Sequence, residues 1–218
     1  MRTWLITLLA TLLRGLFRRR LGRRVFAPII NPRNILVVKP CCLGDVLLTT
    51  PLVAALRTNY PTAQITYAVR PWARPMVASS PHIDAVLTLP ETWTPGTMVA
   101  VVRELRRRSF DLVCVPDRSP TLTLLMWWAG IPQRVGLDSA GRGFAYTHPV
   151  AVTSIVQHEA DVYNQLALAM GLPVPPHRLF FFPPPVAQQA LSNMLAVPHD
   201  PDRRLVVVHP GGGQNPGM

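Results

Sequence analysis

The feature that most constrains the fold is an alternation of apolar runs with amphipathic segments, which begins at residue 34. Residues 34–39 (NILVVK) are almost entirely apolar, as in a strand that is buried on both faces of a parallel sheet. Residues 51–60 (PLVAALRTNY) fit a helix. Thr50 could cap this helix, and Pro51 suits its first turn.

The same alternation continues along the chain. We expect further strands at 63–69, 84–89, 110–116 and 134–137, and helices at 96–109, 119–130 and 157–172. Gly130 suits the end of its helix. Strands that alternate with helices over short connections predict an α/β fold with an open, doubly wound parallel sheet, a Rossmann-like domain over residues 34–199.

A second domain is predicted to begin at residue 200. Two proline-rich breaks flank a helical segment between residues 180 and 203, and a new strand at 204–210 then runs into the glycines of GGGQNPGM. A strand with apolar side chains needs a second layer to bury them. We therefore expect residues 200–218 to be the first strand and loop of a truncated domain, and the chain to be incomplete for activity.

The positive charge is concentrated in residues 1–33. The formal net charge is +11, and the first 34 residues contain eight arginines and no acidic residue. The body is only mildly basic, which opposes nucleic-acid binding. The apolar run at 4–13 is shorter than the roughly 20 residues that span a bilayer, and arginines follow it where a signal peptide has small residues.

These features predict an amphipathic helix on the anionic inner face of the cytoplasmic membrane. The alternatives are a helix that docks on the protein's own second domain, or a wrongly assigned start codon. The cysteines favour a reducing compartment. Cys41 and Cys42 are adjacent and Cys114 stands apart, which gives neither a disulfide framework nor metal-ligand spacing.

The loop from Lys39 to Asp45 is the candidate site. It directly follows the first strand, and ligands bind at the carboxyl ends of strands in open parallel sheets. Gly44 would allow a tight turn or the close approach of a ligand. The start of the next helix favours an ionised carboxylate, so Asp45 could accept a proton from a substrate, or it could simply cap the helix. The loop lacks the glycine pattern of a dinucleotide site.

The segment 35–69 (ILVVKPCCLGDVLLTTPLVAALRTNYPTAQITYAV) resembles the start of glycosyltransferase family 9, the lipopolysaccharide heptosyltransferases. That family opens with a strand, a basic residue, a Ser-Ser-Leu-Gly-Asp-like loop and a helix entered by Thr-Pro. The likeness continues through 110–150, 158–173 and 204–218. Cys41 and Cys42 replace the commoner serines, and PDRSP at 116–120 departs from the family's usual loop.

The resemblance implies a GT-B fold, in which two Rossmann-like domains enclose a cleft. It implies transfer of a heptose-type sugar from ADP-heptose to a lipopolysaccharide-core or related glycolipid hydroxyl, with inversion and no metal or other cofactor. Asp45 matches the catalytic base. Lys39, Gly44 and Arg118 are expected to bind the acceptor; Arg134 and Arg142 are weaker candidates.

Gly211, Gly212 and Gly213 match the loop that contacts the donor diphosphate, where backbone amides can hold phosphate oxygens. The alternative interpretations are a solvated lysine at position 39 and a flexible terminus at the three glycines. For the whole chain, the alternative is a non-catalytic Rossmann-like module that binds a nucleotide or a partner at the membrane surface.

Overall fold

The computed structural model describes residues 28–29, 31–152, 158–174, 178–195 and 206–208. Contacts between residues divide the chain into two units, Met1–Pro183 and Pro184–Met218. The predicted domain boundary at residue 199, and residues 1–27 and 30 of the predicted basic segment 1–33, lie outside the described residues. The domain limits therefore stay predictions.

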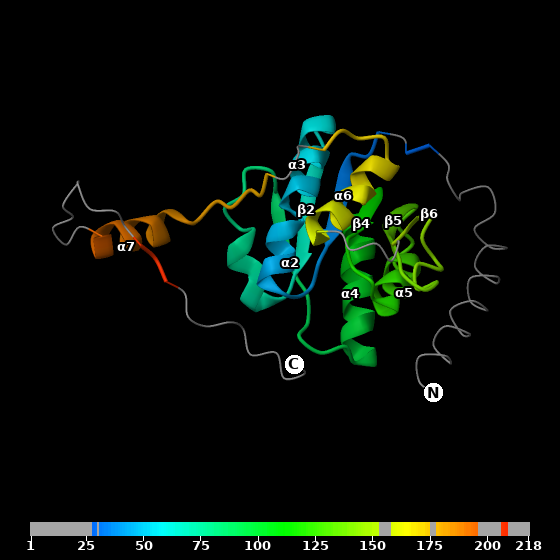
Figure 1. Ribbon diagram of the computed structural model, residues 1–218. Helices are drawn as coiled ribbons and strands as arrows, with labels where there is room; N and C mark the ends of the chain where they lie inside the picture. Colours follow the sequence, from blue (N-terminus) through cyan, green and yellow to red (C-terminus); the bar gives the residue numbers. More distant parts are fainter. Residues whose placement is uncertain (1–27, 30, 153–157, 175–177, 196–205, 209–218) are drawn as a thin grey trace. The chain divides into compact units, whose positions relative to one another are not determined.

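Unit 1 is built on a six-stranded parallel sheet, which confirms the predicted α/β class (Figure 1). All neighbouring strands pair in parallel, in the order β3-β2-β1-β4-β5-β6. The strands are β1 (Asn34–Val38), β2 (Gln64–Val69), β3 (Ala85–Thr88), β4 (Leu112–Val115), β5 (Gln133–Asp138) and β6 (His148–Ala151). This is the strand order of a doubly wound dinucleotide-type fold. The short β6 was not predicted.

Helices connect the strands of this sheet. They are α2 (Leu43–Leu48), α3 (Thr50–Asn59), the 3-10 helix η2 (Pro71–Met76), α4 (Pro95–Arg108), α5 (Pro120–Trp128) and α6 (Glu159–Ala169). The helices α2 and η2 were not predicted. The expected cap at Thr50 is wrong. Thr50 is the first residue of α3, whose N-cap is Thr49, and the Thr50 hydroxyl donates to the Leu47 carbonyl in the last turn of α2.

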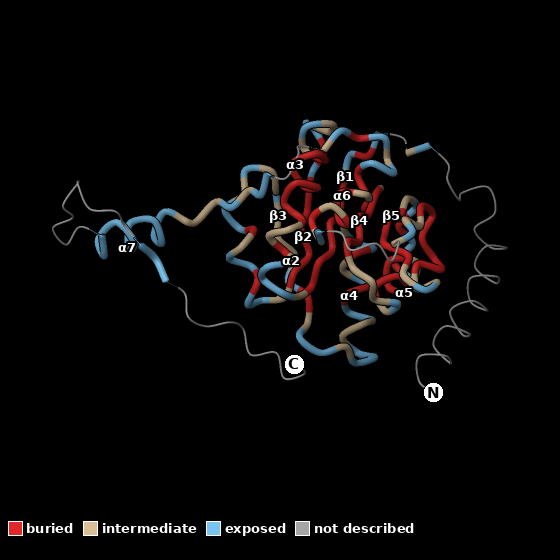
Figure 2. The backbone as a smooth tube through the Cα atoms, viewed as in Figure 1, coloured by how far each residue is buried: buried red, intermediate tan, exposed pale blue. Residues whose placement is uncertain are grey.

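Two apolar cores lie on opposite faces of the sheet. Alternate residues of β1 enter different cores, with Ile35 and Val37 in one and Leu36 and Val38 in the other. The first core packs against α2, α3 and α6, and the second against α4 and α5. Figure 2 shows the resulting burial along the strands. The central strands therefore hold their carboxyl ends in fixed positions.

Gly136, in β5, gives the first testable prediction. A Cβ at this position would lie 2.3 Å from the Tyr146 ring, which is 2% exposed and has little room to move. We expect Gly136→Ala to lower the free energy of unfolding by about 3 kcal/mol, the upper part of the usual range for overpacking. Chemical denaturation measures this, with Gly96→Ala as the control because only Thr94 Oγ1, at 3.9 Å, lies near its added Cβ.

Unit 2 contains α7 (Pro185–Leu195), which confirms the helix predicted between the two proline-rich breaks. None of its residues is buried. Val206, Val207 and Val208 are also described; they are exposed and do not belong to a strand. The other residues of the predicted strand 204–210 lie outside the described residues. Among the described helices of both units, none is long and apolar enough to cross a membrane.

Candidate functional site

The candidate site lies where the order of the strands reverses. The chain proceeds from β1 outward to β2 and β3, and returns to place β4 on the other side of β1. The carboxyl ends of β1 and β4 therefore adjoin, which is where open α/β sheets bind ligands. Lys39 follows β1 and Asp117 follows β4, so residues 78 positions apart meet there.

Lys39 joins two carboxylates at this point. Its Nζ lies 3.2 Å from Asp45 Oδ2 and 3.3 Å from Asp117 Oδ2, and the Lys39 side chain is only 6% exposed. The ammonium also lies 5.1 Å from the centre of the Tyr163 ring, in a cation–π contact. The expected position of Lys39 at the strand end is confirmed, but it is a buried, paired lysine. The alternative of a solvated lysine is wrong.

The charge state of Lys39 follows from these neighbours. Burial alone would lower the pKa of Lys39, but the negative charges of Asp117 and Asp45 outweigh this effect and raise the pKa well above its usual value. Lys39 is thus a permanent cation. It carries one positive charge between two acidic side chains.

Asp45 lies in the first turn of α2, an unpredicted helix that precedes the one expected at 51–60. Its side chain is 32% exposed, so one part contacts Lys39 and another faces solvent. The helix has no side-chain cap, so the alternative that Asp45 serves as its cap has no support here. A carboxylate that is oriented by a buried cation and still open to solvent can accept a proton from a bound hydroxyl.

Asp117 is the residue that sequence reasoning missed. Its Oδ1 accepts a hydrogen bond of 2.8 Å from the Ser119 backbone N–H, while its Oδ2 faces Lys39. Asp117 therefore links the start of α5 to the loop after β1. The available signal was a carboxylate placed directly after the strand predicted at 110–116.

Gly44 is not the residue that makes the turn. A Cβ at Gly44 would have nothing within 4 Å, and the positive φ of this loop belongs to Cys42, at 70°. The expectation of a tight turn at Gly44 is therefore wrong. Its lack of a side chain leaves open space over the start of α2, where a ligand could approach the backbone.

Arg118 and Arg134 were both predicted to face the acceptor, and the structure shows them engaged elsewhere. One guanidinium nitrogen of Arg118, Nη2, donates to both carboxylate oxygens of Glu159, at 3.0 and 3.1 Å. Arg134 is 4% exposed and donates to the Ala145 and Ile131 carbonyls. Arg134 is thus a structural residue of the β5 region, and its candidacy as a ligand contact is wrong. Arg118 stays a predicted contact, since its pair is partly exposed.

Arg70, which follows β2, was not singled out from the sequence. Its backbone N–H donates to the Pro40 carbonyl at 3.1 Å, so it lies beside the loop after β1. Its Nε is buried without a hydrogen-bond partner. Among the described residues, its side chain has no ion pair. The neighbouring Trp72 is 46% exposed.

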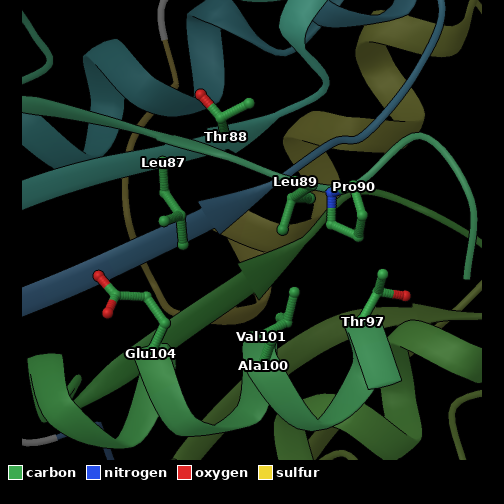
Figure 3. Close-up of a pocket in the computed structure, with 8 residues that line it drawn as sticks. All are labelled: Leu87, Thr88, Leu89, Pro90, Thr97, Ala100, Val101 and Glu104. Atoms are coloured by element: carbon green, nitrogen blue, oxygen red, sulfur yellow. The ribbon is translucent and has the colours of Figure 1, made fainter. Parts of the chain in front are cut away.

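A separate apolar pocket of about 280 Å³ lies between the end of β3 and α4 (Figure 3). Leu87 and Leu89 face Val101 across it, and Glu104 lies at one end. It contains none of the predicted site residues. We assign the chemistry to the strand ends, because the paired charges lie there.

Two further predictions concern metals and the donor. In the part of the chain that the structure describes, no three His, Cys, Asp or Glu side chains group in a way that could hold a metal ion. Gly211, Gly212 and Gly213 lie outside the described residues, so their contact with the donor diphosphate stays a prediction.

Comparisons of sequence identify bacterial relatives of this chain. It is 29% identical over 106 residues to lipopolysaccharide heptosyltransferase 2 of Escherichia coli, a match that covers 47% of this chain and 30% of the relative. It is 25% identical over 140 residues to lipopolysaccharide heptosyltransferase 3 of the same organism, covering 57% and 40%. The chain thus spans less than half the length of the curated relatives it matches. No protein-family profile matches it.

Solved structures share the fold. A glycosyl transferase family 9 protein from Veillonella parvula superposes with a TM-score of 0.65 at 20% identity, covering 78% of this chain and 50% of that one. The ADP-heptose heptosyltransferase II of E. coli superposes with a TM-score of 0.58 at 22% identity, covering 75% and 50%. These matches show a common fold over about half of each solved chain.

Proposed function

Because the chain belongs to glycosyltransferase family 9, the family of the lipopolysaccharide heptosyltransferases, we propose that it is the acceptor-binding part of an inverting glycosyltransferase. In this proposal the whole protein transfers a heptose-type sugar from ADP-heptose to a hydroxyl of a lipopolysaccharide core or related glycolipid. Asp45 is the general base. It removes the proton of the acceptor hydroxyl as the oxygen attacks the anomeric carbon, and the nucleoside diphosphate leaves from the opposite face.

One observation carries the proposal. The Asp45 carboxylate is oriented by the buried Lys39 at the carboxyl end of β1, yet its side chain is 32% exposed. General-base catalysis needs such a carboxylate, fixed in place but able to reach a proton on a bound substrate. A carboxylate with a purely structural role would be expected to use all of its oxygens within the fold.

We propose that acidic groups of the acceptor bind cationic side chains at the carboxyl ends of the central strands. Lys39 is paired with two carboxylates and Arg118 with Glu159, so their charges are largely offset. Arg70 has no such partner among the described residues, and a guanidinium pairs well with phosphate or carboxylate oxygens. We therefore add Arg70 to the predicted acceptor contacts Lys39, Gly44 and Arg118.

The predicted contact at Arg70 can be tested by kinetics. We expect Arg70→Gln in the full-length protein to raise the KM for the acceptor about tenfold while kcat stays near the wild-type value, because a charge-assisted hydrogen bond contributes roughly 1.5–3 kcal/mol. Arg106→Gln is the matched control, since Arg106 lies on α4 and donates to the Trp128 carbonyl at the end of α5, away from the carboxyl ends of β1 and β4. An unchanged KM would contradict the assignment.

Gly44→Ala tests whether the acceptor approaches the start of α2. Nothing lies within 4 Å of the added Cβ, and alanine is favoured over glycine in a helix by about 0.5–1 kcal/mol. We expect the thermal midpoint to stay the same or rise slightly, while the KM for the acceptor increases. A variant with unaltered kinetics would show that this open space is not used by the ligand.

Two parts of the proposal concern segments that lie wholly or mostly outside the described residues. Residues 1–33 are proposed to bind the inner face of the cytoplasmic membrane, where confinement with a lipid acceptor would raise their effective concentrations. Gly211, Gly212 and Gly213 are proposed to hold the donor diphosphate.

The test of the function is a transfer assay with the full-length protein. ADP release from ADP-heptose is measured with and without a heptose-free lipopolysaccharide core. We expect release that depends on the acceptor and persists in a chelator. If full-length protein binds the nucleotide sugar but releases no ADP with any core acceptor, the alternative of a non-catalytic binding module would replace the transferase.

A further inference from the structure

The two cysteines of the loop after β1 have their thiols close together. The Sγ atoms of Cys41 and Cys42 lie 3.2 Å apart. Adjacent side chains of an extended chain point to opposite sides, but Cys42 has a φ of 70° and departs from that geometry. Cys42 is exposed and Cys41 is half-buried, so the pair is open to solvent.

A direct disulfide does not suit this pair. The Cα atoms of consecutive residues are about 3.8 Å apart across a trans peptide. Disulfides usually join Cα atoms that are about 4.4–6.8 Å apart. A disulfide between Cys41 and Cys42 would therefore be strained, and an atom that bridges the two sulfurs is the better fit.

The distance between the sulfurs fits some bridging atoms better than others. With sulfur bonds of about 2.3 Å, as in thiolate–zinc sites, sulfurs 3.2 Å apart subtend an angle of about 90°. Tetrahedral zinc would need sulfurs about 3.8 Å apart and two further ligands. Trivalent arsenic forms three pyramidal bonds at angles near a right angle, and it needs only two protein thiols because an oxygen or carbon fills the third position.

We propose that Cys41 and Cys42 form a chelating site for trivalent arsenic, as arsenite or an organoarsenical. In the reaction of arsenite, or of the hydrated dihydroxy form of an organoarsenical oxide, each thiol gives its proton to a hydroxyl on arsenic. Two As–O bonds break, two As–S bonds form and two waters leave, with no change in oxidation state. The bound arsenic would close a ring over the loop that leads into Asp45. This inference does not depend on the proposed transferase activity.

Mass spectrometry of the intact full-length protein tests the site, with phenylarsine oxide as the probe. We expect one phenylarsenic group per chain and the loss of two free thiols. A chelate should resist excess monothiol and be removed by 2,3-dimercaptopropanol. Cys41→Ser and Cys42→Ser should each lose the adduct that survives monothiol.

Cys114→Ser is the matched control. Cys114 is fully buried in β4, and burial raises the pKa of its thiol to about 12, so this variant should bind like the wild type. Circular dichroism confirms that each serine variant is folded. An adduct that survives monothiol in either single loop variant, or no adduct in the wild type, would overturn the proposal.

Discussion

Asp45→Asn in the full-length protein is expected to lower kcat by about two to four orders of magnitude, the usual contribution of a general base. The amide has nearly the same shape as the carboxylate but cannot take the proton of the acceptor hydroxyl. The fold should survive, because Asp117 still neutralises Lys39. Donor affinity should be unchanged, since Asp45 is proposed to act on the acceptor.

The matched control for this variant is Glu104→Gln, which makes the same acid-to-amide change on α4. Glu104 is paired with Arg107 and Arg108 on the surface of that helix, so its loss should leave transfer unaffected. Steady-state rates and donor titrations on the wild type, Asp45→Asn and Glu104→Gln test whether Asp45 is the base. Wild-type turnover in Asp45→Asn would rule out Asp45 as the base and leave the family assignment intact.

Lys39→Met is expected to lower the free energy of unfolding by about 3 kcal/mol, the lower end of the range for breaking a buried ion pair. The substitution keeps a similar volume but leaves Asp117, with a side chain 15% exposed, facing Asp45 without a cation. We take the lower end because Asp45 is partly solvated. Chemical denaturation of the variant and the wild type measures the difference.

A second variant separates lost charge pairing from lost packing. Lys39→Met/Asp117→Asn removes the uncompensated carboxylate, so it should be more stable than Lys39→Met alone. Arg74→Met is the control for an exposed cation, because among the described residues the Arg74 guanidinium makes one hydrogen bond, of 3.5 Å, to the Val86 carbonyl. Equal stability of Lys39→Met and the wild type would show that solvent reaches both carboxylates.

The pH dependence of this stabilisation follows from the raised pKa of Lys39. A raised pKa in the folded state means that the stabilisation is complete below the pKa of an unfolded lysine, about 10.4. It is lost only as the pH rises through the higher folded-state value. The free energy of unfolding that Lys39 contributes, measured as the difference between the wild type and Lys39→Met, should therefore be the same at pH 7 and pH 9.

The sequence by itself determined the fold class and the place of the site. Residues 35–38 of the first strand are continuous in apolar side chains because both faces of the strand are buried there, and this pattern is readable without a structure. The position of Asp45 at a strand end followed from the same pattern. These features depend on residues close together in the chain, where periodicity and turn chemistry act.

Only the tertiary structure decided which charged side chains are paired with one another inside the fold. Asp117 meets Lys39 across 78 positions of sequence, and Arg118 reaches Glu159 across 41. No local pattern encodes such pairs, because they depend on which strands become neighbours. The parallel order placed β4 beside β1, and this pairing made Lys39 a buried link between two carboxylates.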